Sequence, residues 1–409
     1  MTKNKIIQVP RRFVQQEWGG TETVIIETSH ELSKLGYDVE IFTSKVLSGI
    51  TRENILGVPV RRFSYFYPRL GLSRDNKIRL DMRGGNVFSP GFLLAILFMR
   101  NIKVIHLHTG GFLGGFVRLV CRLRKIPYVL SIHGGALDLP AQQLKEIVAP
   151  LKGSFNWGKI FEVALRCSRV NQDAAAIICV CESERELMAK RYPQTKVVYV
   201  PNGVDIKRFA SGDAARFRDK FALGGRDILL YVGGFYPQKN HFVLLEAFAE
   251  TLKSHPQTVL VLIGVAYDKA FYEKLTNQIA ALDIAASVIL LPNLKFEDNM
   301  LIDAYAAASV FVFPSKYETF GIVALEAWAA RKPVICGKVG GLVSFIRDKE
   351  NGLFFDVDSA QDLQHKIAML LDDKDLAAKL AHNGAVEVQN YSWSKITEKL
   401  AAIYEGKKI

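Results

Sequence analysis

The sequence predicts an α/β protein with two Rossmann-like domains, on the strength of three observations. Short apolar strands alternate with helices in both halves of the chain. The strands are continuous Val, Ile and Leu runs without polar alternation, which is typical of parallel strands buried on both faces. The length of 409 residues suits two or three domains of ordinary size. Helices that separate such strands indicate doubly wound sheets.

The first half opens with an apolar strand at 5–9, followed by a helix at 21–35 and a second strand at 38–43. Further strands of this half are expected at 104–108, 128–133, 176–181 and 196–201. Pro201, Asn202 and Gly203 then supply turn residues directly after the last of these strands. This half therefore predicts one complete parallel α/β unit.

The second half repeats the alternation after a polar, glycine-containing stretch at 211–226. Its strands are expected at 228–233, 258–264, 287–291, 310–314 and 333–337, and its helices at 240–252, at 271–282 and from about 320 onward. The domain boundary should lie near the turn at 201–205. We therefore expect an N-terminal domain at 1–205 and a C-terminal domain at 206–390.

Composition excludes several classes of protein. With 49% hydrophobic and 23% charged residues, the chain is not a disordered protein, a collagen or a coiled-coil rod. The longest apolar run, at 92–99, is too short to span a bilayer, which needs about 20 residues. The start of the chain shows no signal-peptide pattern. Five cysteines within largely apolar stretches favour a reduced, cytoplasmic protein.

The positive charge is concentrated in the first half. The net charge is +12; residues 1–200 hold 29 basic and 16 acidic residues, and the remainder holds 24 and 25. Within 60–126 there are 13 basic residues and only two acidic ones. Such an excess indicates an anionic partner: nucleic acid, an anionic membrane or a phosphorylated ligand.

Two candidate sites follow strands of the first half. Gly19 and Gly20 open a helix, where glycines let backbone amides approach a phosphate. His133 ends a strand and precedes two glycines, so it could hydrogen-bond a sugar hydroxyl or a phosphate. A plain glycine turn and a structural histidine are the competing interpretations. His106 and His108 end another strand and are more consistent with a structural role.

Lys239 is the third candidate. It follows the strand at 228–233 and the glycine pair Gly233-Gly234, and it stands just before the next helix. An ammonium group there could act as a point charge against a diphosphate. An ordinary surface lysine is the alternative.

The strongest candidate is the segment from Glu318 to Glu326. Glu318 lies in the loop after the strand at 310–314, and Glu326 lies within the apolar helix that follows. The first-turn amides of this helix, at Phe320, Gly321 and Ile322, can hold phosphate oxygens. A carboxylate on an apolar helix needs a partner. A ribose with two vicinal hydroxyls would suit Glu326, and an internal ion pair is the alternative.

In their order, these motifs resemble those of nucleotide-sugar-dependent glycosyltransferases of the GT-B fold, close to the large retaining family 4. The resemblance extends over nearly the whole chain and includes residues 200–205, Gly340-Gly341 and Tyr391-Ser392-Trp393. It implies two Rossmann-like domains facing a central cleft. It also implies that the segment 391–409 is a helix packing back on the N-terminal domain.

The resemblance assigns roles to the candidate residues. Glu318 would contact hydroxyls of the transferred sugar, Glu326 would bind the ribose, and Lys239 would neutralise the diphosphate. The amides at 320–322 would hold phosphate and sugar oxygens. The remaining donor-side residues are Gly19 and Gly20, where diphosphate and acceptor would meet, His133 near the donor sugar, and Gly234 on the loop that carries Lys239.

One departure concerns the diphosphate clamp. Many relatives have an arginine five residues before the lysine, and this chain has Gly234 there. Arg11 and Arg12 could supply the missing cation. No metal and no cofactor are expected, and the co-substrate would be a UDP- or GDP-sugar. Retention would fit front-face attack, in which the leaving phosphate accepts the acceptor's proton and no protein base is needed.

The basic segment of the first half predicts the acceptor. Cations and aromatic residues alternate there, as suits an anionic bilayer surface. The residues expected to serve membrane and acceptor are Arg61, Arg62, Arg69, Arg74 and Arg79. We expect a cytoplasmic protein, peripheral on the inner face of the membrane. Its acceptor would be a lipid-linked glycan of exopolysaccharide, capsule or lipopolysaccharide synthesis. A solvated basic face is the competing interpretation.

Three rival functions remain open at this level. A catalytically weak sugar- or nucleotide-binding protein on the same fold, partner to another transferase, is supported by Gly234. A nucleic-acid binder fits the charge but lacks a recognition motif, so no nucleic-acid partner is expected. An epimerase or phosphorylase of this fold is the third. The sequence specifies neither the sugar nor the base, whose recognition is expected from backbone around 291–295.

Overall fold

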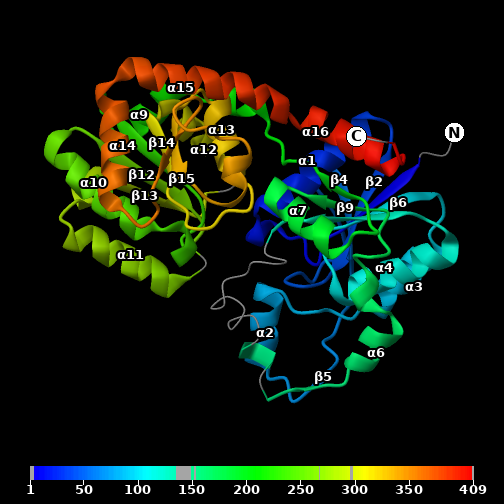
Figure 1. Cartoon of the computed structure of the whole chain (residues 1–409). Coiled ribbons are helices and arrows are strands. Elements are labelled where there is room, and N and C mark those ends of the chain that lie inside the picture. Colours follow the sequence, from blue (N-terminus) through cyan, green and yellow to red (C-terminus); the bar gives the residue numbers. More distant parts are fainter. Residues whose placement is uncertain (1–3, 135–148, 152, 267, 295–297, 408–409) are drawn as a thin grey trace. The chain divides into compact units, whose positions relative to one another are not determined.

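The computed structural model describes residues 4–134, 149–151, 153–266, 268–294 and 298–407. The chain forms two compact units (Figure 1). Unit 1 comprises Met1–Pro201 and Trp393–Ile409, and unit 2 comprises Asn202–Ser392. The change of unit at Pro201 falls on the turn residues that follow the last strand of the first half.

The described residues of unit 1 form an eight-stranded sheet in the order β10-β9-β7-β6-β1-β2-β4-β3. Neighbouring strands are parallel except β3, which runs antiparallel to β4. The strands are β1 (Lys5–Val9), β2 (Asp38–Ser44), β3 (Arg52–Ile55), β4 (Val58–Phe63), β6 (Ile102–Leu107), β7 (Tyr128–Ile132), β9 (Ala176–Cys179) and β10 (Val197–Tyr199). The chain reverses its direction across the sheet between β1 and β6, which makes the carboxyl ends of these strands a topological switch point.

Helices cover both faces of this sheet. On one face α1 (Gly20–Lys34) contributes Ile25 and Ile26 to a core with Phe13 and Ile41, and α16 (Trp393–Tyr404) packs on α1. On the other face, Phe92 and Phe116 pack among the strand residues. They belong to α3 (Pro90–Phe98) and α4 (Gly111–Arg124), and α7 (Glu182–Arg191) adds to the same core. The closing helix therefore belongs to unit 1, as the resemblance implies.

A small substructure extends unit 1 beyond its sheet. Strand β5 (Arg69–Leu70) pairs antiparallel with β8 (Phe155–Asn156), next to α2 (Arg74–Arg83), η2 (Ala149–Leu151) and α6 (Lys159–Ala164). Within unit 1, Figure 1 shows α2, β5 and α6 at the end remote from α16. The sequence did not predict this substructure, because its strands are two residues long and its hydrophobic pattern is not periodic.

The described residues of unit 2 form a six-stranded parallel sheet in the order β13-β12-β11-β14-β15-β16. The strands are β11 (Ile228–Val232), β12 (Val259–Gly264), β13 (Val288–Pro292), β14 (Val310–Phe313), β15 (Val334–Gly337) and β16 (Leu353–Phe355). The strand order reverses between β11 and β14. The switch point of unit 2 therefore lies where the loops after these two strands emerge.

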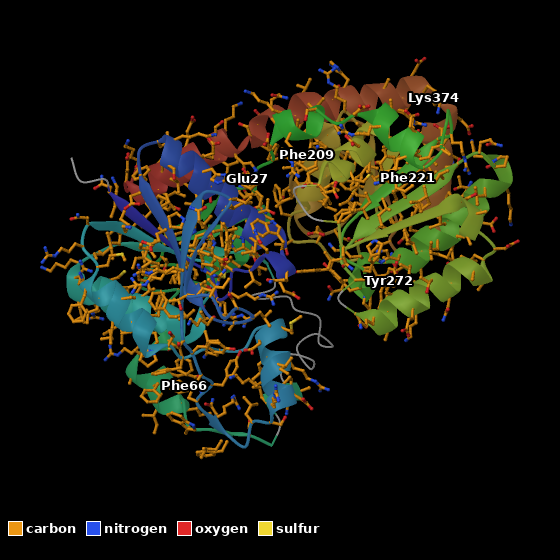
Figure 2. All side chains as sticks on the ribbon, turned by 180° about the vertical axis from the view of Figure 1, so that it is seen from behind. Glu27, Phe66, Phe209, Phe221, Tyr272 and Lys374 are labelled. Atoms are coloured by element: carbon orange, nitrogen blue, oxygen red, sulfur yellow. The ribbon has the colours of Figure 1, made fainter. Side chains whose placement is uncertain are left out.

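Helices of unit 2 pack in two groups (Figures 1 and 2). The first group is α10 (His241–Ser254), α11 (Lys269–Ala281) and α14 (Ala360–Asp372). The second is α8 (Ile206–Ala210), α9 (Ala214–Lys220), α12 (Asn299–Ala307), α13 (Ile322–Ala329) and α15 (Lys374–Glu387). No helix among the described residues has the length and apolar character needed to cross a membrane.

Every strand expected from the apolar runs is present within a few residues of its predicted bounds. The predicted α/β class is confirmed, because both sheets are dominated by parallel strands with helices between them. The sequence missed β3 and β4, whose polar residues and Pro59 hide the strand pattern.

Candidate active site

The switch point of unit 2 brings together the two loops that carry the strongest candidates. Residues 233–240 follow β11, and residues 314–321 follow β14, the neighbouring strand. The amide of Lys316 donates to the carbonyl oxygen of Gln238 at 3.0 Å and joins the two loops. Parallel pairing of β11 with β14 thus places Lys239 and Glu318 at one edge of the sheet.

Lys239 and Glu318 form a nearly buried ion pair. The Lys239 Nζ donates to Glu318 Oε2 at 2.6 Å, and the two side chains are 12% and 16% exposed. The ammonium also lies 4.9 Å from the ring centre of Phe313. Burial opposes the charge, but the Glu318 carboxylate and Tyr236 leave the pKa of Lys239 above its ordinary value. Lys239 is therefore not the solvated surface lysine that the sequence left open.

Glycines hold the Glu318 loop in place. The amide of Gly341 donates to the Glu318 carbonyl oxygen at 3.0 Å. A Cβ at Gly340 would lie 1.8 Å from the same oxygen, and one at Gly341 would lie 2.0 Å from the Thr319 carbonyl oxygen. Only glycine allows this close backbone approach. Gly321 has φ +90° and begins α13 without a side-chain cap, which leaves first-turn amides open to an anion.

Position 234 has no room for a larger side chain in this conformation. A Cβ at Gly234 would lie 2.4 Å from a ring carbon of Tyr236. The aromatic ring of Tyr236 thus lies where the side chain of a larger residue at position 234 would begin. Lys239 is the cation that this chain places on the loop, and its Nζ lies 5.7 Å from the centre of the same ring.

Glu326 is buried on the second turn of α13 and is hydrogen-bonded to a tyrosine. Tyr305 Oη donates to Glu326 Oε2 at 2.7 Å, and the two residues are 0% and 7% exposed. Burial raises the pKa of Glu326 to about 7, against smaller opposing effects of Tyr305 and Arg208. The carboxyl therefore changes protonation state near neutral pH. Sequence analysis missed Tyr305, although a tyrosine in an apolar helix signals a hydroxyl in need of a partner.

The switch point of unit 2 thus combines a cation, two carboxylates and an uncapped helix start. Phosphate oxygens can be bound by Lys239 and the first-turn amides of α13, and hydroxyls can donate to Glu318 and Glu326. This set of groups suits a ligand that carries both phosphates and vicinal hydroxyls.

The glycine loop of unit 1 is already occupied by a carboxylate. Gly19 is the N-cap of α1, and its amide donates to Glu22 Oε2 at 3.1 Å. Burial raises the pKa of Glu22. An anion at this loop would have to compete with Glu22. Arg11 and Arg12 are also engaged, since their guanidinium groups donate to the carbonyl oxygens of residues 80–82.

His133 belongs to a network of histidines at the switch point of unit 1. His133 Nε2 lies 2.7 Å from His108 Nδ1, and His108 Nε2 lies 2.7 Å from Gln8 Oε1. His106 is bonded separately to Ser131 and Tyr404, at 2.7 and 2.6 Å. His106 is 2% exposed and His108 is half-buried, and both rings are hydrogen-bonded to side chains of unit 1, as a structural role for these two histidines predicts.

The predicted membrane residues do not all lie on the surface. Arg62 is 1% exposed, donates to the carbonyl oxygen of Phe13 and forms an ion pair with Glu53. The assignment of Arg62 to a membrane surface is therefore wrong, because alternation along β4 turns its side chain into the core beneath α1. Arg61 is half-buried against the rings of Phe42 and Phe63.

The other three arginines lie in the extension of unit 1. Arg69 is half-buried and donates to Ser154 Oγ at 3.1 Å, whereas Arg74 and Arg79 are exposed on α2. Gly135, the second of the two glycines after His133, and Lys295, in the segment expected to recognise the base, lie outside the described residues. Asp356 and Asp358 follow β16 in a loop, where Lys316 pairs with Asp358.

Sequence comparison identifies two families along the chain. The profile described as "Glycosyltransferase Family 4" matches residues 18–208, and the profile described as "Glycosyl transferases group 1" matches residues 213–387. A relative in Segniliparus rotundus, a D-inositol 3-phosphate glycosyltransferase, is 31% identical over 405 residues. The alignment covers 95% of this chain and 84% of the relative.

Solved structures share the fold at lower sequence identity. Sucrose-phosphate synthase from Thermosynechococcus elongatus superposes with a TM-score of 0.74 at 22% identity, over 99% of both chains. Anabaena HepE in complex with UDP-glucose superposes with a TM-score of 0.72 at 18% identity, over 98% of this chain and 99% of the other.

Proposed function

The chain belongs to the group 1 glycosyltransferases of family 4, with the GT-B fold, and from this premise we propose a specific reaction for it. It is a nucleotide-sugar-dependent transferase. In our proposal it moves a sugar, with retention of anomeric configuration, from a UDP- or GDP-sugar to a lipid-linked glycan. The place of reaction is the inner membrane surface, during synthesis of a cell-envelope polysaccharide.

The observation that supports binding of a nucleotide-sugar donor is the Lys239–Glu318 pair beside the start of α13, with Glu326 one turn into the helix. Departure of the nucleoside diphosphate leaves negative charge on its phosphates. Lys239 and the first-turn amides lie ready to balance that charge, and a preorganised cation stabilises it more than water does. Glu318 holds the ammonium in position when no donor is bound.

In this scheme the two carboxylates accept hydrogen bonds from different hydroxyls of the donor. Glu326, which the hydrogen bond from Tyr305 holds in place within α13, accepts hydrogen bonds from the ribose hydroxyls. Glu318 accepts from hydroxyls of the transferred sugar. Retention then needs no protein base: the acceptor hydroxyl attacks from the face of the leaving group, and the departing phosphate oxygen takes its proton. HepE, whose structure holds UDP-glucose, supports a UDP-sugar as the first donor to test.

The small substructure around β5 and β8 supports the proposal that the acceptor is bound at a membrane surface. Large apolar side chains are exposed around β5, β8 and α6: Leu70 is 63% exposed, Phe155 68%, Ile160 74% and Val163 77%. Helix α2 of the same substructure is basic, with Arg74, Lys77 and Arg79 exposed. Exposed apolar groups with surrounding cations fit the interface of an anionic bilayer, where one part is buried and the other meets phosphates.

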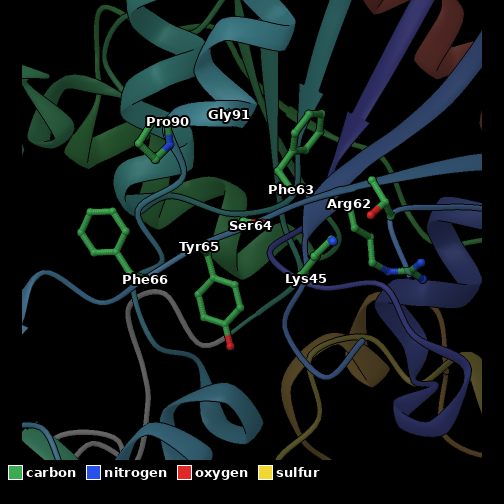
Figure 3. A pocket seen from close by; sticks show the side chains of 9 residues that line it. Lys45, Arg62, Phe63, Ser64, Tyr65, Phe66, Pro90 and Gly91 are labelled. Atoms are coloured by element: carbon green, nitrogen blue, oxygen red, sulfur yellow. The ribbon is translucent and has the colours of Figure 1, made fainter. Parts of the chain in front are cut away.

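A groove beside this substructure suits the glycan part of an acceptor. It has a volume of about 370 Å³ and lies at the end of β4 (Figure 3). Its lining combines the rings of Tyr65 and Phe66 with Lys45 and the hydroxyls of Thr51 and Ser64. Figure 3 shows the Arg62 side chain pointing away from these two rings. Aromatic faces with a few polar groups are typical of small-molecule sites.

A second acceptor class is favoured by the relatives. The Segniliparus relative is named for D-inositol 3-phosphate, and sucrose-phosphate synthase is also named for a phosphorylated product. A small phosphorylated polyol is therefore the alternative acceptor. Release of UDP from UDP-glucose in the presence of D-inositol 3-phosphate, without lipid, would support that alternative over a lipid-linked glycan.

Donor binding is tested first, by thermal unfolding with UDP, GDP, ADP and their sugars. A ligand that binds the native state raises the melting temperature by mass action. We expect one nucleotide series to shift the parent and to shift Glu326→Ala less. No shift with any of them would favour a protein that has lost donor binding.

Membrane binding is tested by flotation with vesicles that contain half phosphatidylglycerol. We expect the parent to float and Ile160→Ser/Val163→Ser to remain in the dense fraction. Val386→Ser is the matched control, since Val386 is 59% exposed in unit 2. Equal flotation of the parent and the α6 variant would refute this surface.

A further inference from the structure

Asn240 occupies a helix-capping position, but its side chain does not cap the helix. The residue follows Lys239 and directly precedes α10, and its backbone is left-handed, with φ +57° and ψ +37°. Asparagine tolerates such a backbone, and its side chain commonly caps the start of a helix. Within the described residues the Asn240 side chain makes no capping hydrogen bond to α10, although the residue is only 6% exposed. Its amide therefore serves another contact.

That contact is made with the loop after β16. Asn240 Nδ2 donates to the carbonyl oxygen of Val357 at 2.7 Å. In the sheet, β14 and β15 lie between β11, which leads to the Lys239 loop, and β16, which leads to Val357. The hydrogen bond therefore connects the Lys239 loop to the loop of the edge strand, past the carboxyl ends of two intervening strands.

The loop at 356–358 has a fixed position relative to the sheet. Val357 packs over the end of β15, since a Cβ at Gly337 would lie 2.4 Å from Val357 Cγ1. The amide of Asp358 donates to Asp356 Oδ1 at 3.1 Å, and the amide of Asp356 donates to Asp362 Oδ2 of α14 at 2.8 Å. Packing on one side and these two hydrogen bonds on the other keep the Val357 carbonyl oxygen in one place.

The same loop also makes an exposed contact, which differs in strength. Lys316, in the loop that carries Glu318, pairs with Asp358, and these two side chains are 48% and 73% exposed. Exposed ion pairs contribute little, because water and salt screen them. A buried amide hydrogen bond is costly to break, because the groups left behind lack water to bind. Asn240 is therefore the side chain that fixes the Lys239 loop to the loop at 356–358.

The position of Asn240 determines what the Lys239 ammonium reaches. Lys239 ends the short 3₁₀ helix η4 (Pro237–Lys239), and the amide of Asn240 closes this turn on the carbonyl oxygen of Pro237 at 3.1 Å. Fixing the Asn240 side chain therefore fixes the backbone from which Lys239 extends. From that backbone Nζ reaches Glu318 Oε2 at 2.6 Å. A displaced turn would carry the ammonium away from this partner.

We propose that Asn240 is a positioning residue, which fixes the Lys239 ammonium where a diphosphate binds by holding its turn to the loop at 356–358. The binding of a diphosphate rests on the proposed function. Control over the position of Lys239 does not, because it follows from contacts within unit 2 alone.

The position of Lys239 is tested without a ligand, by the rate at which acetic anhydride acylates its amine in the full-length protein, measured by mass spectrometry. In the parent, burial and the ion pair protect the amine. Asn240→Gly keeps the left-handed backbone and removes the donor, so we expect the rate to rise about fivefold. Asn101→Gly is the matched control, since Asn101 has φ +61° and is exposed in unit 1. An unchanged rate in Asn240→Gly overturns the positioning role.

Two further variants separate the buried contact from the exposed one. Asn240→Ser is uncharged and too short to reach Val357, and it must also acylate faster should Asn240→Gly not fold. Asp358→Asn removes only the exposed ion pair with Lys316, and we expect it to keep the parent rate. A rise in Asp358→Asn as large as that in the Asn240 variants would assign the positioning to the exposed pair and overturn the proposal.

The diphosphate is tested by titration calorimetry with UDP and with uridine, which has no phosphate. We expect Asn240→Gly to weaken UDP binding about fivefold and to leave uridine binding unchanged. In the Lys239→Met background the same substitution should leave UDP binding unchanged, because two residues that act through one contact are not additive. Equal weakening of both ligands, or of UDP in both backgrounds, overturns the diphosphate assignment. A parent that binds neither ligand counts against the proposed function, while the acylation rates still decide the positioning role, so the two failures are distinguishable.

Discussion

The buried carboxyl of Glu326 should make the stability of the protein depend on pH. Burial raises its pKa from 4.5 to about 7, so the native state retains the proton over a range in which the unfolded chain has lost it. Between about pH 4.5 and pH 7 the native state binds more protons, and stability contributed by this group is lost as pH rises. Above pH 7 the full cost of the buried charge is present.

The size of the effect follows from the shift. A displacement of about 2.5 pKa units, at about 1.4 kcal/mol per unit, corresponds to about 3 kcal/mol. Glu326→Gln keeps a side chain that can accept from Tyr305 but carries no charge. The variant should match the parent near pH 5 and exceed its free energy of unfolding by about 3 kcal/mol at pH 8.

Urea unfolding from pH 5 to pH 8, followed by tryptophan fluorescence, to which Trp328 on the same helix contributes, measures this difference. With a slope of about 2–3 kcal/mol per M, the midpoint of the variant should rise above that of the parent by about 1 M at pH 8. Glu350→Gln, at a side chain 67% exposed, is the matched control and should follow the parent at every pH. A constant difference between Glu326→Gln and the parent would refute the argument.

Three further predictions concern the same charges. Lys239→Met should lower kcat/KM for the donor about 100-fold or more, because the loop at 233–240 contains no other cation to replace it. The release of UDP from the donor measures this rate. An unchanged rate would show that Lys239 takes no part in the mechanism. Nucleotide affinity should weaken up to about tenfold per pH unit below pH 7, because the ribose hydroxyls donate to the ionised form of Glu326. Titration calorimetry at several pH values measures this affinity. The same pH dependence in Glu326→Gln would contradict the prediction. Arg62→Met should lower the free energy of unfolding by about 2–4 kcal/mol, because Glu53 loses its partner. The same variant should float with vesicles as the parent does, and lost flotation of a stable Arg62→Met protein would return Arg62 to the membrane surface.

The sequence predicted the sheets well because their strands are buried on both faces. Such strands must be continuously apolar, and that pattern is visible in a single sequence. Strand β4 was missed for the opposite reason. It contains Pro59 and, two residues later, the pair Arg61-Arg62, and a charged pair indicates a surface loop unless the tertiary partners are known. Those partners, Glu53 and the Phe13 carbonyl oxygen, come from other segments.

The site could be predicted as a set of residues but not as a set of contacts. Lys239 and Glu318 were identified because each lies in a loop between a strand and a helix, and Glu326 because it is a carboxylate on an apolar helix. Their partners are distant in sequence: Lys239 meets Glu318 across 79 residues, and Tyr305 precedes Glu326 by 21. Parallel pairing of β11 with β14 creates the first contact, and packing of α12 beside α13 creates the second.

The sequence by itself determined the fold class, the family resemblance and the residue types at the ends of the strands, because these depend on local pattern and spacing. Only the tertiary structure decided the electrostatics of those residues. Burial raises the pKa of Glu326 to about 7. Folding also pairs Lys239 with Glu318 and places the Arg62 side chain in the core. Each of these properties depends on desolvation and on partners that only folding brings together.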